Sequence, residues 1–338
     1  IVIASPQSTH CKIALEAFKN KKHVFCEKPL GATVDESRTM LAAAENSGLI
    51  HMTGFNYIRT PASQYARQLI SEGRIGEITW FRGEHTEDFL ADPLIPTNWR
   101  TEGISNGTMG DLAPHMINAA RALVGPITTL NASVETVHVN RPGGQVTNDD
   151  QAQMMCRFEN GAQGHLFFSR VATGRKMGYA YEIHGTMGSI RFDQEDQNAL
   201  HLYTMDGLES ERGFKKILTG PTHPNYEAFC QGPGHGTGYQ DQIIMHMILV
   251  NKDEKEYQLR IKANTNDSRE SSSIYVAQKL FRAGALLEIY DPMTSEKNIF
   301  KDINFYWESS KIKDLKTRIT VIDSLSKLDQ NIHAVAIL

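Results

Sequence analysis

The 338-residue sequence lacks the features that mark several classes of protein. It has only four cysteines and no C-x-x-C spacing, so neither a disulfide framework nor a zinc site is predicted. Its longest strongly apolar run, Ile243–Val250, is interrupted by His246 and is far shorter than the ~20 residues of a membrane-spanning helix. The net charge is −4, so no basic excess favours nucleic acid or an anionic membrane. These absences predict a soluble, cytoplasmic protein with no nucleic-acid partner and no membrane partner.

A starting methionine is also lacking, and no basic region typical of a signal peptide precedes the first apolar residues. The chain begins with Ile1–Ala4 and ends with Ala334–Leu338. Both are short apolar runs of the kind that form buried parallel strands. We therefore expect both ends of the chain to fall in the middle of an α/β fold.

Residues 1–60 alternate between strand-like and helix-like segments, which predicts α/β structure with a parallel, doubly wound sheet. Strands are expected at Ile1–Ala4, His23–Cys26 and Leu49–Gly54, and helices at 11–20 and Val34–Ser47. Thr33 and Glu36 have the spacing of a capping box at the start of the second helix, and Gly48 is expected to end it.

Residues 61–250 predict a second, α+β domain with an open, mostly antiparallel sheet. The expected strands are Glu77–Arg82, Ile127–Asn140, Gln151–Phe158, Ala162–Ser169 and Tyr179–Phe192, with a helix near 111–124. Residues 194–240 are polar and rich in Gly, Pro and His, so we expect a loop there. A charged run at 251–256 precedes a third, α/β segment, 257–338. It has expected strands at Tyr257–Ile261, Ala285–Tyr290, Arg318–Ile322 and His333–Leu338, and a helix over Ser272–Ala283.

The tripeptide Glu27-Lys28-Pro29 directly follows an expected buried strand. In open parallel sheets, ligands bind outside the carboxyl ends of the strands. Pro29 restricts the backbone on both sides of its peptide bond, so Lys28 would be held in that crevice, where it could exchange a proton with a ligand. A solvated lysine in a turn explains the same tripeptide, and both interpretations stand at this point.

Asp111 and His115 are four residues apart, a spacing that places two side chains on one face of a helix. Histidine is suited to proton transfer at neutral pH, and a neighbouring carboxylate can orient it. The alternative is a helix start, with Asp111 as the N-cap and Pro114 in the first turn. A metal site is not predicted, because no third ligand is near.

Several motifs in this order resemble the Gfo/Idh/MocA family of NAD(P)-dependent sugar and polyol oxidoreductases. They are Ile-x-Ala-Ser-Pro-x-x-x-His at the start, E-K-P-L-G at 27–31, Gly54-Phe55-Asn56-Tyr57-x-Arg59-x-Pro61-Ala62, Asn98-Trp99-Arg100, D-x-x-x-H at 111–115, and Glu182–Ile190. The resemblance covers about residues 1–243. It implies that residues 1–60 are the second half of a dinucleotide-binding Rossmann domain. Residues 61–250 would form the substrate and oligomerisation domain.

The resemblance also implies roles for individual residues. Lys28, Asp111 and His115 would be catalytic, exchanging the proton of a sugar or polyol hydroxyl while the carbinol carbon exchanges a hydride with NAD or NADP. The peptide before Pro29 is often cis in this family. The implied cofactor-binding residues are Ser5, Pro6, His10, Glu27, Lys28, Trp99 and Arg100, and the implied substrate-binding residues are Asn56, Tyr57, Arg59, Asp111 and His115. A homo-oligomer formed through the open sheet is expected.

The sequence departs from the family pattern in two places. Ala113-Pro114 and Asn118 stand where the family commonly has Gly before the histidine and Asp three residues after it. No G-x-G-x-x-G turn occurs, and the nearest glycine cluster, 232–236, contains Pro233 and His235. Because that turn and the helix after it normally hold the cofactor pyrophosphate, we expect weak dinucleotide binding and impaired activity.

Residues 257–338 resemble a different family, the C-terminal nucleotide-sugar-binding domain of UDP-glucose dehydrogenase. The resemblance is carried by Arg260–Ile274, Gly284-Ala285 and Ile289–Pro292. It implies that Lys262 and Arg269 lie near a UDP-sugar or cofactor, whereas Ser271–Ser273 alone are equally explained as helix caps. Two alternatives to a Gfo/Idh/MocA oxidoreductase therefore remain: a UDP-glucose dehydrogenase-like protein, and a non-catalytic sugar-binding or oligomerising module.

Overall fold

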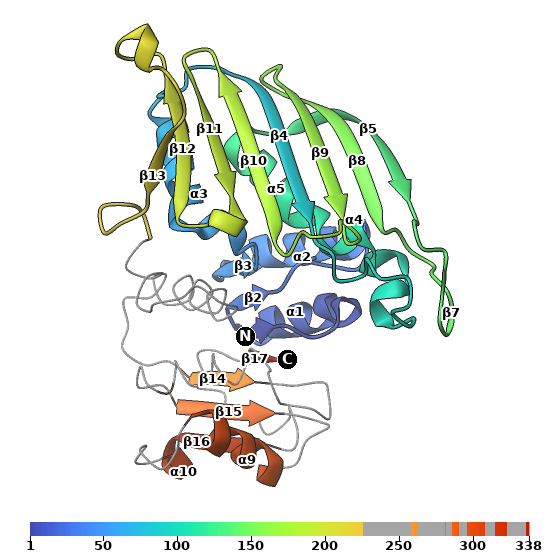
Figure 1. The fold of residues 1–338 in the computed structure, drawn as a ribbon. Helices are drawn as coiled ribbons and strands as arrows, with labels where there is room; N and C mark the ends of the chain where they lie inside the picture. The colour runs from blue at the N-terminus through green and yellow to red at the C-terminus, as the bar shows by residue number, and fades with distance from the viewer. Residues whose placement is uncertain are drawn as a thin grey trace. The chain divides into compact units, whose positions relative to one another are not determined.

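The computed structural model describes residues 1–225, 258–261, 281, 286–290, 296–307, 315–322 and 336–337. The chain forms two compact units (Figure 1). Unit 1 comprises Ile1–Gly54 and Gly234–Leu338, and unit 2 comprises Phe55–Pro233. The three segments expected from the sequence, 1–60, 61–250 and 257–338, stay a prediction.

Unit 1 contains the expected parallel sheet, with strand order β17-β1-β2-β3. The strands are β1 (Val2–Ile3), β2 (Val24–Cys26), β3 (His51–Thr53) and β17 (Ala336–Ile337), and the helices are η1 (Gln7–Thr9), α1 (His10–Lys19) and α2 (Val34–Ser47). Val2 pairs with Phe25 on one side and with Ala336 on the other. The apolar sequence of β1 follows from this central place, because both its edges are paired and its side chains are buried.

The ends of α2 are confirmed as expected. The Thr33 hydroxyl accepts a hydrogen bond from the Glu36 N–H at 3.2 Å, and the Glu36 carboxylate accepts one from the Thr33 N–H. Gly48 ends the helix with a φ of 64°, a left-handed conformation that glycine adopts without a steric penalty.

The described part of 258–338 contains a parallel three-stranded sheet, β14-β15-β16. Its elements are β14 (Gln258–Ile261), β15 (Leu286–Tyr290), α9 (Glu296–Tyr306), α10 (Leu315–Arg318) and β16 (Ile319–Ile322). The strands are those expected from the sequence, whereas α9 and α10 were not predicted. The helix expected over Ser272–Ala283 lies outside the described residues except for Phe281.

Unit 2 is built on an eight-stranded sheet with the order β13-β12-β11-β10-β4-β9-β8-β5. The strands are β4 (Ile78–Thr86), β5 (Ile127–Glu135), β8 (Gln151–Phe158), β9 (Gln163–Ser169), β10 (Gly178–Gly185), β11 (Gly188–Asp193), β12 (Ala199–Thr204) and β13 (Lys215–Leu218). All neighbours are antiparallel except β4 and β9, which are parallel. The open, mostly antiparallel sheet is therefore confirmed.

The loop expected over 194–240 is wrong for part of its length, because β12 and β13 lie within it. Leu200 and Leu202 of β12 are buried in the core, whereas His201 between them is partly exposed. This two-residue alternation was present in the sequence but was hidden by the surrounding polar, glycine-rich residues.

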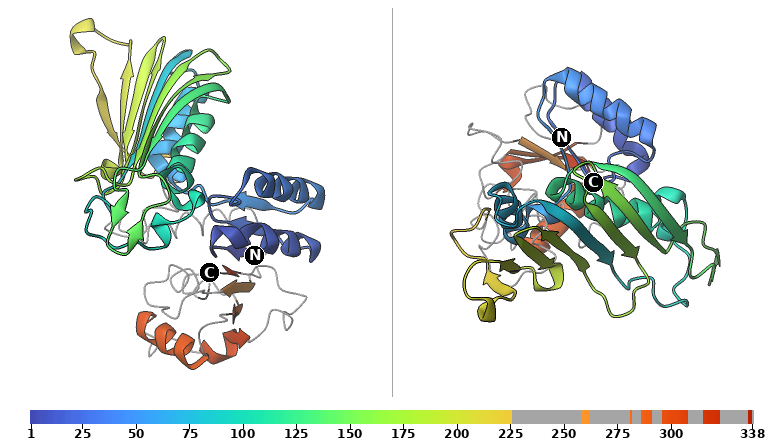
Figure 2. Two further views of the ribbon diagram at one scale, coloured as in Figure 1. Left: turned by 90° about the vertical axis from the view of Figure 1, so that its right-hand side faces the viewer. Right: turned by 90° about the horizontal axis from the view of Figure 1, so that it is seen from above.

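Two helices, α3 (Pro61–Ser71) and α5 (Ala113–Leu123), cover one face of this sheet (Figure 2). The inward side chains of the strands form the core against them, including Phe81, Leu166, Tyr181 and Ile183. Short elements connect the larger ones: η2 (Tyr57–Arg59), η3 (Trp99–Thr101), η4 (Ile104–Asn106), α4 (Thr108–Asp111), the β6–β7 hairpin (Asn140–Arg141, Gly144–Gln145), η5 (Gln194–Asp196) and η6 (Glu209–Glu211).

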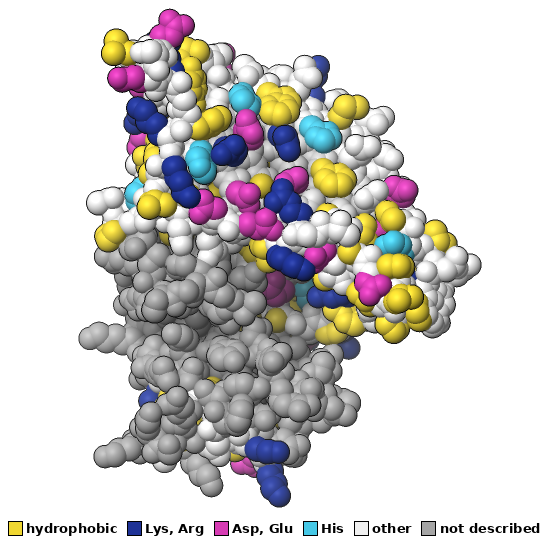
Figure 3. Space-filling model, viewed as in Figure 1, with side chains coloured by type: hydrophobic (Ala, Val, Ile, Leu, Met, Phe, Trp, Pro, Cys, Tyr) yellow, Lys and Arg dark blue, Asp and Glu magenta, His cyan; other side chains and the backbone are white. Residues whose placement is uncertain are grey.

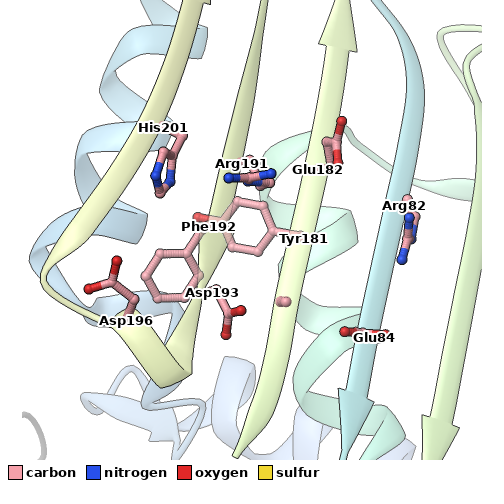
Figure 4. Close-up of a pocket in the computed structure, with 10 residues that line it drawn as sticks. Arg82, Glu84, Tyr181, Glu182, Arg191, Phe192, Asp193, Asp196 and His201 are labelled. Atoms are coloured by element: carbon pink, nitrogen blue, oxygen red, sulfur yellow. The ribbon is translucent and has the colours of Figure 1, made fainter. Parts of the chain in front are cut away.

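The other face of the sheet carries charged side chains of both signs (Figure 3). Arg82, Glu182 and Arg191 stand in register on β4, β10 and β11, and the adjacent register row carries Glu84, Ala180 and Asp193. A hollow of about 540 Å³ is lined by both rows, including the small side chain of Ala180. Figure 4 shows the charged side chains of the two rows around it. Within the part of the chain that the structure describes, no helix is long and apolar enough to cross a membrane.

Candidate functional site

The implied site residues fall into two groups, one in each unit. Unit 1 holds Ser5, Pro6, His10, Glu27 and Lys28, and unit 2 holds Asn56, Tyr57, Arg59, Trp99, Arg100, Asp111 and His115. Lys262 and Arg269 lie outside the described residues. Among the residues that the structure does describe, no group of three His, Cys, Asp or Glu side chains is arranged to hold a metal ion.

The turn after β1 is fixed by its own side chains. The Ser5 and Thr9 hydroxyl oxygens are 2.5 Å apart, and the Thr9 hydroxyl donates to the Pro6 carbonyl at 2.7 Å. His10 is buried, with its Nε2 2.8 Å from the Ser5 carbonyl oxygen and its Nδ1 3.0 Å from the Pro29 carbonyl oxygen. His10 therefore joins the turn after β1 to the turn after β2, at the edge where ligands bind in parallel sheets.

Glu27-Lys28-Pro29 stands at the carboxyl end of β2, and the Lys28–Pro29 peptide is cis, as the family resemblance implies. Burial raises the pKa of the Glu27 carboxyl, although the Lys28 N–H and the Lys28 charge act in the opposite direction. The Lys28 N–H donates to Glu27 Oε2 at 3.2 Å. A Cβ at position 54 would lie 2.9 Å from Glu27 Oε1, so glycine at that position leaves the space that the carboxylate occupies.

Cys26 precedes this tripeptide but is not suited to nucleophilic catalysis. Its side chain is buried, and burial followed by the charge of Glu27 raises the pKa of the thiol to about 12. Because the thiolate is the reactive form, this cysteine is expected to be inert at neutral pH.

In unit 2, Arg100 and Asp111 form an ion pair, with 2.7 Å between Arg100 Nη1 and Asp111 Oδ2. The guanidinium also lies over the rings of Trp99 and Phe89, 4.4 and 5.2 Å from their centroids. The planar guanidinium is thus held by aromatic faces and by one carboxylate. This contact brings together two motifs, Asn98-Trp99-Arg100 and D-x-x-x-H, that are separate in the sequence.

Asp111 and His115 do not share one helix, so that expectation is wrong. Asp111 is the last residue of α4, Leu112 lies between the two helices, and His115 is in the first turn of α5. Pro114 is in that first turn, as expected. The break has a local reason, because the Pro114 nitrogen cannot donate to the carbonyl of residue 110 and so cannot continue α4.

His115 is buried in a cluster of aromatic rings. Its ring centroid lies 4.3 Å from that of Tyr57, 5.5 Å from that of His85 and 6.1 Å from that of Phe55. Tyr57 also contacts the Tyr179 ring at 5.0 Å. Packing against these rings leaves the His115 side chain only 6% exposed and restricts the orientation of the imidazole.

His85, Glu87 and Tyr179 were not identified from the sequence. His85 Nδ1 lies 2.9 Å from the Leu112 carbonyl oxygen, and its Nε2 lies 3.2 Å from Glu87 Oε1. Since a carbonyl can only accept, His85 donates from Nδ1 to the Leu112 carbonyl. The one sequence signal for His85 and Tyr179 was their inward position on alternating strands, which equally predicts core residues.

The segment that enters α3 supplies the remaining implied substrate residues. Asn56 is 6% exposed, and its Oδ1 has no hydrogen-bond partner among the described residues. Burial, followed by the nearby charge of Arg67, lowers the pKa of Arg59. A buried amide oxygen that lacks a donor is suited to accept a hydrogen bond from a ligand hydroxyl.

Comparison with known proteins assigns the first segment of unit 1 and most of unit 2. The sequence model "Oxidoreductase family, NAD-binding Rossmann fold" matches residues 1–55, and "GFO/IDH/MocA C-terminal domain" matches residues 63–191. Levoglucosan dehydrogenase of Pseudarthrobacter phenanthrenivorans is 39% identical over 263 residues, which are 72% of this chain and 67% of that enzyme. The chain belongs to the Gfo/Idh/MocA oxidoreductase family.

Solved structures of the Gfo/Idh/MocA family agree with this assignment. Levoglucosan dehydrogenase in complex with NADH and levoglucosan has a TM-score of 0.69 at 40% identity, over 72% of this chain and 67% of that chain. Among the curated relatives, scyllo-inositol 2-dehydrogenase (NAD(+)) of Bacillus subtilis is 32% identical over 56% of this chain and 54% of its own length. The chain thus spans about half to two thirds of the length of these relatives.

The final segment matches a different family. The sequence model "UDP-glucose/GDP-mannose dehydrogenase family, UDP binding domain" matches residues 259–338. The resemblance stated for 257–338 is therefore confirmed at the level of the sequence.

Proposed function

We propose that this chain carries the machinery of an NAD-dependent dehydrogenase that oxidises a carbinol of a sugar or anhydrosugar, with levoglucosan as the first substrate to test. The observation that carries the proposal is the 39% identity to levoglucosan dehydrogenase over 263 residues. The regions matched by the family models, 1–55 and 63–191, contain Glu27-Lys28-Pro29, Trp99-Arg100 and Asp111-x-x-x-His115.

The residues after β1 and β2 fit a nicotinamide dinucleotide by their chemistry. The buried Glu27 carboxylate has acceptor capacity beyond the single Lys28 N–H, which suits ribose hydroxyl donors. In the proposal, Ser5, Pro6, His10, Glu27 and Lys28 hold the cofactor, together with Trp99 and Arg100. NAD is preferred to NADP, because the related levoglucosan dehydrogenase has been solved in complex with NADH. When bound, the cofactor would supply the acceptor for the hydride of the carbinol carbon.

The chain's own residues would accept the proton of the substrate hydroxyl and stabilise the charge that develops on its oxygen. His115 takes the hydroxyl proton as the carbon–hydrogen bond breaks, and Lys28 stabilises the negative charge that develops on the oxygen. Asp111, held by Arg100, completes the acid–base set. Asn56, Tyr57 and Arg59 bind the other hydroxyl groups of the sugar. The product is the corresponding ketone or lactone.

The test is the reduction of NAD by the purified chain with levoglucosan, glucose or inositol, followed at the absorbance of NADH. Removal of a general acid–base group is expected to lower kcat by roughly 10²–10⁴-fold, so His115→Ala and Lys28→Ala should both fall in this range. Lys12→Ala, a change at an exposed lysine of α1, is the matched control and should retain the parent rate. Equal turnover in His115→Ala and the parent chain would refute the assignment.

Cofactor binding has its own measurement, the titration of NADH fluorescence. Weak binding is expected, because the sequence contains no G-x-G-x-x-G turn to hold the pyrophosphate. Binding of NADH that is unaffected by Glu27→Ala would contradict the assigned cofactor residues. The absence of binding at millimolar NADH would contradict activity in this chain.

A second candidate function concerns the final segment, which matches a UDP binding domain. In this candidate, residues 259–338 bind a UDP-sugar through Lys262 and Arg269. Calorimetric titration with UDP-glucose should show binding that Arg269→Ala abolishes, and the absence of heat with the parent chain would exclude it.

We also propose that two copies associate through the exposed face of the eight-stranded sheet. The support is the neighbouring basic and acidic rows, Arg82–Glu182–Arg191 and Glu84–Ala180–Asp193. A two-fold axis that lies in the plane between the two sheet faces, parallel to these rows and between them, would set the basic row of one copy against the acidic row of the other. The alternative of a non-catalytic oligomerising module uses this same face and differs only in lacking turnover.

A further inference from the structure

The segment 98–111 carries both members of the Arg100–Asp111 ion pair, yet little of it is regular structure. It contains the three-residue helices η3 and η4 and the four-residue helix α4. Helices this short are not stable by themselves, because the free-energy cost of helix nucleation exceeds the stabilisation gained from one or two turns. Asn106 links two turns of the segment by donating to the Trp99 and Glu102 carbonyls, but the distance between Arg100 and Asp111 also depends on contacts from outside the segment.

A fully buried ion pair lies beneath the segment. Arg170 follows β9 and Asp150 precedes β8, and their side chains are 1% and 0% exposed. Arg170 Nε donates to Asp150 Oδ1 at 3.0 Å, and its Nη2 donates to Asn148 Oδ1 at 2.6 Å. Its Nη1 donates to the carbonyl oxygens of Arg100 at 2.6 Å and Asn106 at 3.1 Å. All three guanidinium nitrogens are thus engaged, and one of them holds the backbone of Arg100.

Asn148 fixes the same segment with two further hydrogen bonds. Its Nδ2 donates to the Arg100 carbonyl oxygen at 2.9 Å and to the Gly103 carbonyl oxygen at 3.0 Å. The Arg100 carbonyl therefore accepts from both Arg170 and Asn148. One backbone position, directly under the guanidinium that binds Asp111, is fixed by two buried donors.

The residues next to Asn148 fix the other end of the segment. Asp149 Oδ2 accepts from the Met109 N–H at 2.7 Å, and the Thr108 hydroxyl donates to the Asp150 carbonyl at 2.7 Å. These bonds anchor the start of α4, whose last residue is Asp111. A Cβ on Gly107 would lie 2.2 Å from Asp149 Oδ1, so the backbone approaches this carboxylate as closely as glycine allows.

We propose that Arg170 and Asn148 are positioning residues for the reaction, because together with Asp149 and Asp150 they set the separation of Arg100 and Asp111. This inference rests on the proposed dehydrogenase function, in which both residues of that pair take part. A buried ion pair contributes little net stability over an apolar core. The rigid fork of an arginine, however, can hold two strand ends and two loop carbonyls in one geometry, which an apolar residue cannot do.

The experiment compares Asn148→Ala with Thr136→Val in the full chain. Asn148→Ala removes the two hydrogen bonds that Asn148 donates to the segment and the acceptor of Arg170 Nη2, and leaves the bonds from Arg170 Nη1. Thr136→Val removes a hydrogen bond of 2.8 Å to the carbonyl of the same Asn148 and leaves every bond to Arg100 in place. Comparing the two variants therefore distinguishes a general loss of local stability from a specific loss of the hydrogen bonds that fix the Arg100 backbone.

The first readout does not require activity. Trypsin cleaves after arginine, and the rate of appearance of the new N-terminus at Thr101 reports how firmly the Arg100 backbone is held. Loss of two buried hydrogen bonds is expected to raise this rate about tenfold or more in Asn148→Ala. In Thr136→Val the rate should stay within about twofold of the parent chain.

The second readout is the division of the effect between kcat and KM. Asn148→Ala is expected to lower kcat about tenfold, because Asp111 loses its fixed partner, while KM for the sugar changes much less. Cleavage and kcat that respond equally in the two variants, or in neither, would overturn the proposal. If the parent chain has no turnover, the proposed function fails, and the cleavage rates alone decide whether this network holds Arg100.

Discussion

At the scale of single residues, Glu27 links the stability of unit 1 to pH. Burial raises the pKa of this carboxyl above the ordinary value of 4.5. The folded form therefore retains a proton at pH values where the unfolded chain has lost it. The resulting stabilisation is complete below the unfolded pKa and is lost as pH rises through the folded pKa.

Glu27→Gln removes this titration while keeping the shape of the side chain. We expect the variant to be similar to the parent chain near pH 4 and to gain in relative stability as pH rises towards 7. Urea unfolding of both proteins at a series of pH values measures the difference. A difference that does not change with pH would contradict the buried state of this carboxyl.

Glu195 provides a control, because its pKa is shifted in the direction opposite to that of Glu27. Partial burial raises its pKa, but hydrogen bonds from the Lys176 and Met177 N–H groups and the ion pair with Arg175 outweigh that effect and lower it. Its contribution is therefore present above the unfolded pKa and is lost as pH falls through the folded value. Glu195→Gln should thus be less stable than the parent chain at pH 7 and should approach it at low pH.

At the scale of elements, the capping box of α2 is the clearest case of local sequence fixing local structure. Thr33→Ala removes the acceptor for the Glu36 N–H and is expected to lower the free energy of unfolding of unit 1 by about 1 kcal/mol. Thr39→Ala is the matched control in the same helix. The Thr39 hydroxyl donates only to the Asp35 carbonyl one turn earlier, so its loss should cost little. Urea unfolding followed by circular dichroism compares the two variants.

The contrast between α2 and the Asp111–His115 region shows how far the sequence carries the prediction. The ends of α2 depend on Thr33, Glu36 and Gly48, which lie at those ends in the helix's own sequence, so the sequence predicts them. The interval from Asp111 to His115 fits one continuous helix equally well, and only the missing donor of Pro114 reveals the break. The chemistry proposed for this motif does not depend on the helix being continuous, so its catalytic role stays a prediction.

The partners of these residues could not be predicted in the same way. His85, Tyr179 and Arg170 lie on or just after strands that are distant in sequence from His115 and Arg100. Their roles arise from sheet order and register, which no local pattern specifies. An arginine just after a strand is ordinarily exposed to solvent. The burial of Arg170 is explained only by its partners, which are Asp150 and the backbone carbonyls that accept its hydrogen bonds.

At the scale of the whole molecule, association through the open sheet face predicts an effect of charge reversal. Arg191 is exposed and lies beside Glu182 and His201 in the sheet register. Arg191→Glu places a third carboxylate near Glu182 and Asp193, so we expect it to shift the chain from dimer to monomer. Arg67→Glu, on the helix-covered side, carries the same change of charge and should leave the assembly unchanged.

Sedimentation equilibrium of the parent chain and the two variants provides the measurement. A parent chain that is monomeric at micromolar concentration, or a dimer that tolerates Arg191→Glu, would rule out this face as the contact. Because charge pairs at a protein surface are screened by salt, the shift should be larger at low ionic strength.

The central place of β4 in the eight-stranded sheet has a consequence for how the chain is made. Phe81 of β4 pairs with Ile183 on one side and with Gly164 on the other, so its partners emerge from the ribosome long after it does. Until then, β4 has two unpaired edges, and Phe81 is not yet covered by the core. Contacts between residues so distant in sequence are slow to form, which leaves the nascent chain exposed to aggregation. We therefore expect chaperone supply and synthesis temperature, more than the stability of the finished fold, to govern the yield of folded protein.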